Sequence, residues 1–133
     1  MPAWVISKIS DFFKKKRKTL NKKKNLILGV AYKKNINDTR ESPAFEIIKI
    51  LKQKYKAFVE YCDPFVPVIK NLRNHSISMK SIKINPKKIK EFDVVILVTD
   101  HDKFNYKILK KYSKLLVDTR GIIKKDYSNV ISL

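Results

Sequence analysis

Three polar clusters in this sequence carry residue types that could do chemistry, and each cluster follows an apolar run. The first, residues 32–40, contains Lys33, Lys34 and Arg40 just before a predicted helix start. Cations beside the unpaired N–H groups of a helix N-terminus suit a diphosphate. A solvated surface loop explains the same residues equally well, and Tyr32 fits either stacking on a base or a cap on the core.

The second and third clusters are Thr-Asp-His-Asp at 99–102 and Asp-Thr-Arg at 118–120. His101 and Asp102 could form an acid–base pair, but no serine or cysteine partner is evident for them. The pattern therefore favours a histidine that makes hydrogen bonds within its loop. Arg120 adds a cation to the third cluster.

Two residues near the middle of the chain resemble functional groups but have simpler explanations. Cys62 lies inside a predicted strand, which favours a passive thiol. Asp63 stands where a dinucleotide-binding fold carries the carboxylate that holds a ribose. However, the turn after the first predicted strand has one glycine where a dinucleotide site has three, so a turn formed by Asp63 and Pro64 is favoured.

The clusters need a scaffold that brings them together, and the hydrophobic pattern predicts one. The predicted strands are 26–30, 57–62, 92–98 and 114–117, with shorter candidates in 76–84 and 129–133. The predicted helices are 2–20, 42–54, 86–91 and 104–112. Ser42 is the predicted N-cap of the second helix and Pro43 its first residue. Residues 64–75, bracketed by prolines, predict a loop.

Strands that alternate with helices predict an α/β fold, namely a Rossmann-like parallel sheet with helices on both faces, preceded by an N-terminal helix. The predicted strand 92–98 is apolar at every position except Asp93, as expected of a strand buried on both faces. Ligands of such sheets bind beyond the carboxyl ends of the strands. All three polar clusters fall at those ends, so we expect them to converge on one crevice.

The N-terminal segment, residues 2–20, predicts a helix with one apolar and one very basic face. Its apolar face consists of Val5, Ile9, Phe12 and Phe13. Such a helix packs on a partner or a neighbouring domain, or it lies on an anionic membrane surface. The first interpretation is favoured.

Net charge is the most unusual property of the composition. The 133 residues form one domain by length and carry 31 basic against 12 acidic residues, a net charge of +19. Such a balance attracts polyanions, so a non-enzymatic basic module that binds nucleic acid or an anionic surface is the alternative function. Four of the basic residues are arginine and the lysines are scattered over every predicted helix, so we expect no specific nucleic acid partner.

The cysteine content and the hydropathy of the sequence indicate the cellular compartment in which we expect the protein. The single cysteine excludes a disulfide framework and a cysteine-based zinc site, which fits a reducing cytoplasm. No apolar run approaches the roughly 20 residues of a membrane span, so we expect no membrane partner.

Five stretches resemble, in order along the chain, the C-terminal part of the nucleotide-sugar 6-dehydrogenases, the family of UDP-glucose and UDP-N-acetylhexosamine dehydrogenases. They are MPAWVISKI, LILGVAYKKNINDTRESPA, YCDPFVP, FDVVILVTDHDKFNY and LLVDTRG. The stretch TDHDKFNY is more similar to the branch acting on UDP-N-acetylglucosamine or UDP-N-acetylmannosamine than to the UDP-glucose branch, which usually has a Glu-Trp pair there.

The resemblance implies a ligand for a strand–turn–helix unit with a single glycine. In this family the C-terminal Rossmann-like domain holds the UDP part of the substrate, whereas a separate N-terminal domain holds NAD. By resemblance, Tyr32 and Lys33 contact the UDP-sugar and Arg40 reaches the pyrophosphate of NAD. Arg120 lies in the segment whose arginine faces the substrate, although Gly121 follows where some relatives have a second arginine.

The sequence also departs from the family pattern. Residues 1–133 contain neither Gly-x-Gly-x-x-Gly nor a stretch resembling the loop with the catalytic cysteine, so no catalytic residue is expected in this chain. We expect a C-terminal fragment, inactive alone, with 1–24 as an interdomain linker helix and 25–133 as the UDP-sugar-binding domain.

The family's activity sets the expected context of such a fragment. Family members are homo-oligomers that use NAD to oxidise the C6 alcohol of the sugar to a uronic acid for surface polysaccharides. A separate chain is a possible source of the missing domains, and the hexosamine that is used stays open.

Overall fold

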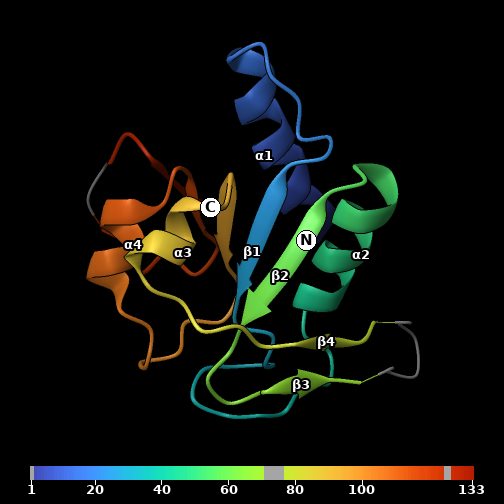
Figure 1. Cartoon of the computed structure of the whole chain (residues 1–133), viewed down its shortest axis with the longest axis vertical. Coiled ribbons are helices and arrows are strands. Elements are labelled where there is room, and N and C mark those ends of the chain that lie inside the picture. Colours follow the sequence, from blue (N-terminus) through green and yellow to red (C-terminus); the bar gives the residue numbers. More distant parts are fainter. Residues whose placement is uncertain (1, 71–76, 125–126) are drawn as a thin grey trace.

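The core of the fold is a five-stranded, fully parallel sheet, seen in a computed structural model that describes residues 2–70, 77–124 and 127–133 (Figure 1). The strands lie in the spatial order β2-β1-β5-β6-β7. Their bounds are β1 Lys24–Leu28, β2 Phe58–Cys62, β5 Val94–Leu97, β6 Leu116–Asp118 and β7 Val130–Ser132. The fold is therefore the predicted Rossmann-like α/β sheet.

Helices cover both faces of the sheet. Helices α1 (Pro2–Lys15) and α2 (Ala44–Lys54) pack on one face, and α3 (Pro86–Lys90) and α4 (Tyr106–Tyr112) pack on the other (Figure 1). Successive strand side chains point to opposite faces, so each strand supplies both cores. Ile27, Val94, Ile96 and Val117 belong to the core under α1 and α2, and Leu26, Leu28, Val95 and Leu97 belong to the core under α3 and α4.

Helix α1 packs on the core of this same chain. Val5 and Ile9 are completely buried in the cluster that includes α2 and the sheet. Each such side chain contributes about 1.5–3 kcal/mol of burial free energy. The helix ends at Lys15, earlier than the predicted residue 20, because Arg17 takes a left-handed conformation with φ 57°. The proposed division of the chain at residue 24 stays a prediction.

None of the helices in the described part of the chain is both long enough and apolar enough to cross a membrane.

Side-chain caps fix where the short helices begin. The Asn85 side chain accepts a hydrogen bond from Lys88 N–H at the start of α3, and Asn105 accepts one from Ile108 N–H at the start of α4. Helix α4 therefore begins two residues later than predicted. At α2 the N-cap is Pro43, one residue after the predicted Ser42, and the Ser42 hydroxyl accepts from Ala44 N–H at 3.3 Å.

A second, two-stranded sheet lies below the carboxyl ends of the large sheet in Figure 1. Strand β3 (Val68–Ile69) pairs in antiparallel fashion with β4 (Met79–Lys80). The candidate strand within 76–84 is confirmed in β4, but the prediction of a loop at 68–69 is wrong. The partner strand lies ten residues away in sequence, which a local reading of proline-rich residues misses. Residues 71–75 of the predicted loop and residue 76 of the candidate strand lie outside the described residues.

Candidate functional site

The three polar clusters converge at the carboxyl ends of the strands, as predicted. The Asn35 side-chain amide donates to Asp102 Oδ2 at 2.8 Å and its oxygen accepts from Asp102 N–H at 3.0 Å. Arg120 Nε lies 3.3 Å from Asp100 Oδ1. The loops after β1, β5 and β6 are thus tied to one another, and together they form one side of the molecule.

Gly29 lets the loop after β1 pass against the loop after β5. Its φ is +85°, and a Cβ placed on it would lie 2.4 Å from Thr99 Cβ and 2.6 Å from Thr99 O. The Thr99 hydroxyl in turn donates to Ala31 O at 2.7 Å. This glycine therefore serves contact between two strand ends rather than contact with a pyrophosphate.

The Asp63 carboxylate binds backbone N–H groups of the loop after β1, which in many strand–turn–helix units bind the anion of a ligand. Its Oδ2 accepts hydrogen bonds from the N–H groups of Val30 and Ala31 at 2.8 and 3.2 Å, and Oδ1 accepts from Phe65 N–H at 2.8 Å. The residue is 1% exposed. The predicted turn role is confirmed, and the carboxylate is not available to a ribose because it serves the protein's own amides.

His101 is a hydrogen-bonding loop residue, as the sequence favoured. Its side chain is completely buried, Nε2 lies 3.0 Å from Asp63 Oδ2, and Nδ1 accepts from Asn35 N–H at 2.7 Å. Burial raises the pKa of the Asp63 carboxyl, but the hydrogen bonds from His101, Val30 and Phe65 outweigh it and hold that pKa below its ordinary value. Both imidazole nitrogens are used inside the protein, which leaves none for acid–base catalysis.

Asp118 shapes the loop that carries Arg120. The Asp118 carboxylate is completely buried and accepts hydrogen bonds from the N–H groups of Arg120, Gly121 and Ile123 at 2.8–2.9 Å. Burial of a carboxylate is tolerated in this way because backbone N–H donors replace the water that it has lost. The turn therefore fixes the backbone of Arg120 just beyond the end of β6.

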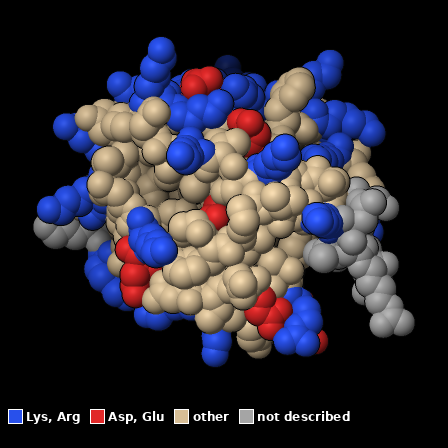
Figure 2. Space-filling model, turned by 60° about the horizontal axis from the view of Figure 1, so that its bottom comes forward, with Lys and Arg blue, Asp and Glu red and all other residues tan. Residues whose placement is uncertain are grey.

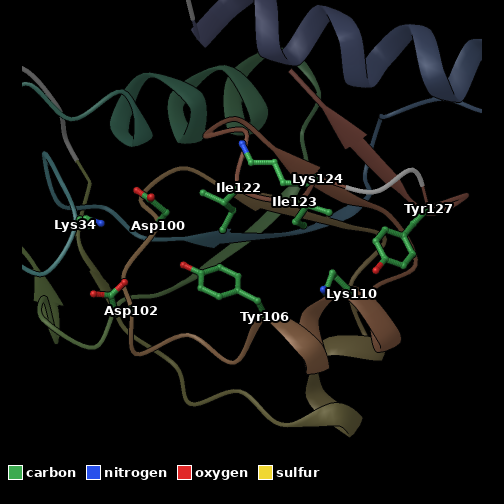
Figure 3. Close-up of a pocket in the computed structure, with 9 residues that line it drawn as sticks. All are labelled: Lys34, Asp100, Asp102, Tyr106, Lys110, Ile122, Ile123, Lys124 and Tyr127. Carbon is green, nitrogen blue, oxygen red and sulfur yellow. The ribbon is translucent and has the colours of Figure 1, made fainter.

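A cavity of about 590 Å³ lies where the three loops meet helix α4 (Figure 3). The residues that line it are contributed by the chain segments after β1, β5 and β6 and by α4: Lys34, Asp100, Asp102, Tyr106, Lys110, Ile122, Ile123, Lys124 and Tyr127. In Figure 3 the Tyr106 hydroxyl points toward the side of Asp100 and Asp102. That hydroxyl donates to His101 O at 2.6 Å, and burial with nearby carboxylates raises the pKa of Tyr106.

The cavity has an excess of positive charge. Three lysines line it against two carboxylates, and each carboxylate already has a partner, Arg120 for Asp100 and Asn35 for Asp102. Cationic walls of this kind favour an anionic ligand. The sequence pointed to Lys34 and to the 99–102 cluster, but it gave no signal for Tyr106, whose role depends on how α4 folds back over the loop.

The wall of this cavity does not include the three residues predicted to bind the UDP-sugar, Tyr32, Lys33 and Arg120. Tyr32 is 52% exposed and Lys33 is exposed in the loop after β1. The Arg120 side chain is 45% exposed beside Asp100. Their roles in binding stay predictions, because no ligand is present to contact them.

Arg40, predicted to reach NAD, extends from the same loop into solvent. Its guanidinium is 88% exposed and pairs with Asp38 Oδ2 at 2.8 Å. Hydrogen bonds from the Arg40 side chain and backbone lower the pKa of Asp38 to about 2. Asp38 uses Nε and one terminal nitrogen of the guanidinium, so the other N–H groups can still bind a phosphate.

Cys62 is the free, buried cysteine of the chain. Burial raises the pKa of the Cys62 thiol to about 11, as expected of a passive thiol. Within residues 2–70, 77–124 and 127–133, no group of three or more His, Cys, Asp or Glu side chains is placed to hold a metal ion.

Figure 2 turns the face with the strand ends toward the reader. Lysine and arginine side chains lie mainly around its margins, whereas its centre is largely uncharged with a few acidic side chains. The bulk charge of +19 is therefore not concentrated over the candidate site. Selectivity for an anion there must come from individual residues.

Comparisons with known proteins agree with this geometry. Residues 26–125 match the model of the UDP-glucose/GDP-mannose dehydrogenase family, UDP binding domain. The chain is 31% identical over 103 residues to a UDP-N-acetyl-D-mannosamine dehydrogenase of Pyrococcus horikoshii, a match covering 74% of the chain and 22% of the relative. It is 30% identical over 97 residues to an NDP-N-acetyl-D-galactosaminuronic acid dehydrogenase of Ralstonia solanacearum, covering 71% of the chain and 22% of the relative.

Solved structures extend the likeness to the whole fold. The structure of the UDP-D-ManNAc dehydrogenase from Pyrococcus horikoshii superposes with a TM-score of 0.74 at 25% identity, covering 98% of this chain and 29% of that one. The chain thus spans less than a third of the length of these relatives. It belongs to the UDP-glucose/GDP-mannose dehydrogenase family, in which it matches the C-terminal, UDP-binding domain.

Proposed function

We propose that this chain is the UDP-sugar-binding domain of an NAD-dependent UDP-N-acetylhexosamine 6-dehydrogenase. The observation that carries the proposal is the convergence of three loops, with Lys34, Arg120 and Lys124 among their cations, at the carboxyl end of a parallel sheet in a UDP-binding family. Ligands of open α/β sheets bind at that end.

The diphosphate of the ligand has the clearest partners. Lys33 is exposed and precedes Lys34, which lines the cavity, and Arg120 presents a planar guanidinium held by one contact to Asp100. Arginine binds phosphate through paired N–H groups, whereas lysine acts as a point charge. The exposed ring of Tyr32 offers a flat surface for the rest of the UDP-sugar. We assign these three residues to substrate binding.

The names of the relatives support an N-acetylated sugar. Two curated relatives act on UDP-N-acetyl-D-mannosamine or an NDP-N-acetyl-D-galactosaminuronic acid by their names, and TDHDKFNY at 99–106 is similar to that branch. We therefore infer a UDP-N-acetylhexosamine as substrate class, for surface polysaccharide synthesis in the cytoplasm.

Arg40 is the residue of this chain that we assign to NAD binding. NAD supplies the hydride acceptor for oxidation of the C6 alcohol. The exposed Arg40 guanidinium keeps free N–H groups beside Asp38, which suits a pyrophosphate held mainly by another domain. The remainder of the NAD site and the catalytic cysteine belong to parts of the enzyme outside these 133 residues, in a homo-oligomer or in a separate chain. In this arrangement residues 1–24 link the two parts.

Thermal unfolding of the chain with and without UDP tests the proposal. Half of the family site is missing, so we expect a dissociation constant on the order of millimolar, about 4 kcal/mol of binding free energy. UDP at about 100 times that constant stabilises the fold by roughly 2.7 kcal/mol, which raises the melting temperature measurably. Lys33→Ala should remove most of this rise.

The matched control is Lys23→Ala, which removes the same charge just before β1, at the opposite end of the sheet. This variant should keep the full response to UDP. If both variants lose the same part of the response, bulk charge explains it and the assigned site is wrong.

A further inference from the structure

The loop between β1 and α2 has no helix or strand of its own, yet it carries Tyr32 and Lys33. Its shape depends on side chains from elsewhere in the chain. Asn35, in the middle of the loop, has φ 63°, and its N–H donates to His101 Nδ1 at 2.7 Å. The first residues of the loop, Val30 and Ala31, donate to Asp63 Oδ2.

His101 cannot move away from this contact without breaking others. Its side chain is completely buried, with Nε2 3.0 Å from Asp63 Oδ2. The ring contacts Phe65 and Phe104, with centroid distances of 4.8 and 5.6 Å. Its backbone oxygen accepts the Tyr106 hydroxyl at 2.6 Å. His101 is thus held by hydrogen bonds to both ring nitrogens, by two aromatic contacts and by a hydrogen bond to its backbone oxygen.

The hydrogen bonds also determine the tautomer. Asn35 offers an N–H, so Nδ1 must be an acceptor without a proton. The ring proton therefore sits on Nε2 and is donated to the Asp63 carboxylate. One buried pair, Asp63 and His101, consequently holds the loop on both sides of Tyr32 and Lys33.

We propose that His101, oriented by Asp63, is a positioning residue that sets the conformation of Tyr32 and Lys33 for the UDP-sugar. The inference rests on the proposed function for its ligand, but the positioning itself is a property of the ligand-free chain. His101 does not touch the ligand, because it is completely buried. It acts through Asn35 N–H.

Two substitutions separate the two hydrogen bonds of the imidazole. In His101→Asn, Oδ1 can take the place of Nδ1 and accept Asn35 N–H, but nothing donates to Asp63. In His101→Gln, the amide nitrogen can take the place of Nε2 and donate to Asp63, but Asn35 N–H loses its acceptor. The two variants remove part of the same ring, so loss of ring packing alone would affect both.

Hydrogen exchange of the loop amides in the ligand-free chain is the first readout. We expect faster exchange of Asn35 N–H by about tenfold or more in His101→Gln, with protection largely kept in His101→Asn. The UDP dissociation constant is the second readout. It should rise about tenfold in His101→Gln and be largely restored in His101→Asn. Unchanged Asn35 exchange in His101→Gln, or equal UDP binding in the two variants, would overturn the proposal.

A measurement on the wild-type chain tests the same contact and does not depend on whether the variants fold. Nuclear magnetic resonance should detect a scalar coupling across the hydrogen bond between Asn35 N and His101 Nδ1, with the ring proton on Nε2. A proton on Nδ1 would refute the positioning contact. If the wild-type chain does not bind UDP, the proposed function fails, whereas exchange and coupling still decide whether His101 positions the loop.

Discussion

Asp63 and His101 form a completely buried pair, with 3.0 Å between Oδ2 and Nε2, that bridges the carboxyl end of β1. Asp63 follows β2 and His101 follows β5, and β1 lies between these two strands in the sheet. The loop that leaves β1 donates backbone N–H groups to both partners, from Val30 to Asp63 and from Asn35 to His101. The pair therefore connects the order of the strands with the shape of the candidate site.

The pair should make stability depend on pH in the acid range. Hydrogen bonds hold the pKa of Asp63 below its ordinary value of 3.8, so its contribution is present above that value and is lost as pH falls through the folded pKa. Asp63→Asn should cost about 1.5–3 kcal/mol of unfolding free energy at pH 7, because a charged acceptor of three buried N–H groups is lost. The difference from wild type should shrink below about pH 4.

Denaturant unfolding between pH 3 and pH 7 measures this difference. Asp11→Asn removes the same charge from the exposed surface of α1 and should change stability by less than about 0.5 kcal/mol. A difference between Asp63→Asn and wild type that stays constant down to pH 3 would show that the Asp63 charge does not stabilise the fold.

Gly29→Ala should be one of the more damaging single changes in the chain. The added Cβ meets Thr99 at 2.4 Å in a conformation with positive φ, so strain and steric overlap both act. We expect a loss of about 3 kcal/mol or more of unfolding free energy. Gly121→Ala is the matched control, because Gly121 has φ +69° and nothing within 4 Å of its Cβ position. It should cost only about 1–2 kcal/mol. Equal losses in the two variants would mean that the contact with Thr99 is not tight.

Cys62 should be unreactive in the folded chain. With the pKa of the thiol raised to about 11, about one molecule in a thousand carries the thiolate at pH 8, and the side chain is also 9% exposed. A thiol reagent followed by absorbance should react slowly with the native chain and rapidly after denaturation. Rapid modification of the native chain would contradict this burial and reopen a chemical role for Cys62.

The sheet was predictable because its strands are strong local patterns. Residues 94–98 are continuously apolar, and the first four of them, Val94–Leu97, form β5. The ends of the strands then located the three polar clusters. Strand β3 was missed because two residues, Val68 and Ile69, carry almost no local signal and gain their structure from pairing with β4.

The contacts between side chains within the candidate site were less predictable than the strands. Asp63 and His101 lie 38 residues apart, and their contact depends on which strands flank β1. The sequence indicated a turn at Asp63 and a hydrogen-bonding His101, but not that these two side chains bind each other. Tyr106 lines the cavity as the first residue of α4, and the start of that helix depends on the Asn105 side-chain cap.

The chain by itself should not oxidise a nucleotide sugar. Its 133 residues contain no Gly-x-Gly-x-x-Gly, and the backbone amides after β1 are occupied by Asp63. Hydride transfer needs the cofactor held against the sugar. Absorbance of NADH should stay at background with UDP-N-acetylhexosamines and NAD. Turnover by the purified chain that persists in Cys62→Ser would contradict this expectation.

Amide chemical-shift mapping with UDP tests the central claim, that the carboxyl ends of the strands bind a uridine diphosphate. Titration of the labelled chain at physiological salt should shift amides of residues 32–40, 99–102 and 118–124 most strongly. Amides of α1 and of the opposite end of the sheet, near Lys23, should stay in place. Shifts spread over the lysine-bearing surface of the helices, or concentrated at that opposite end, would contradict the claim.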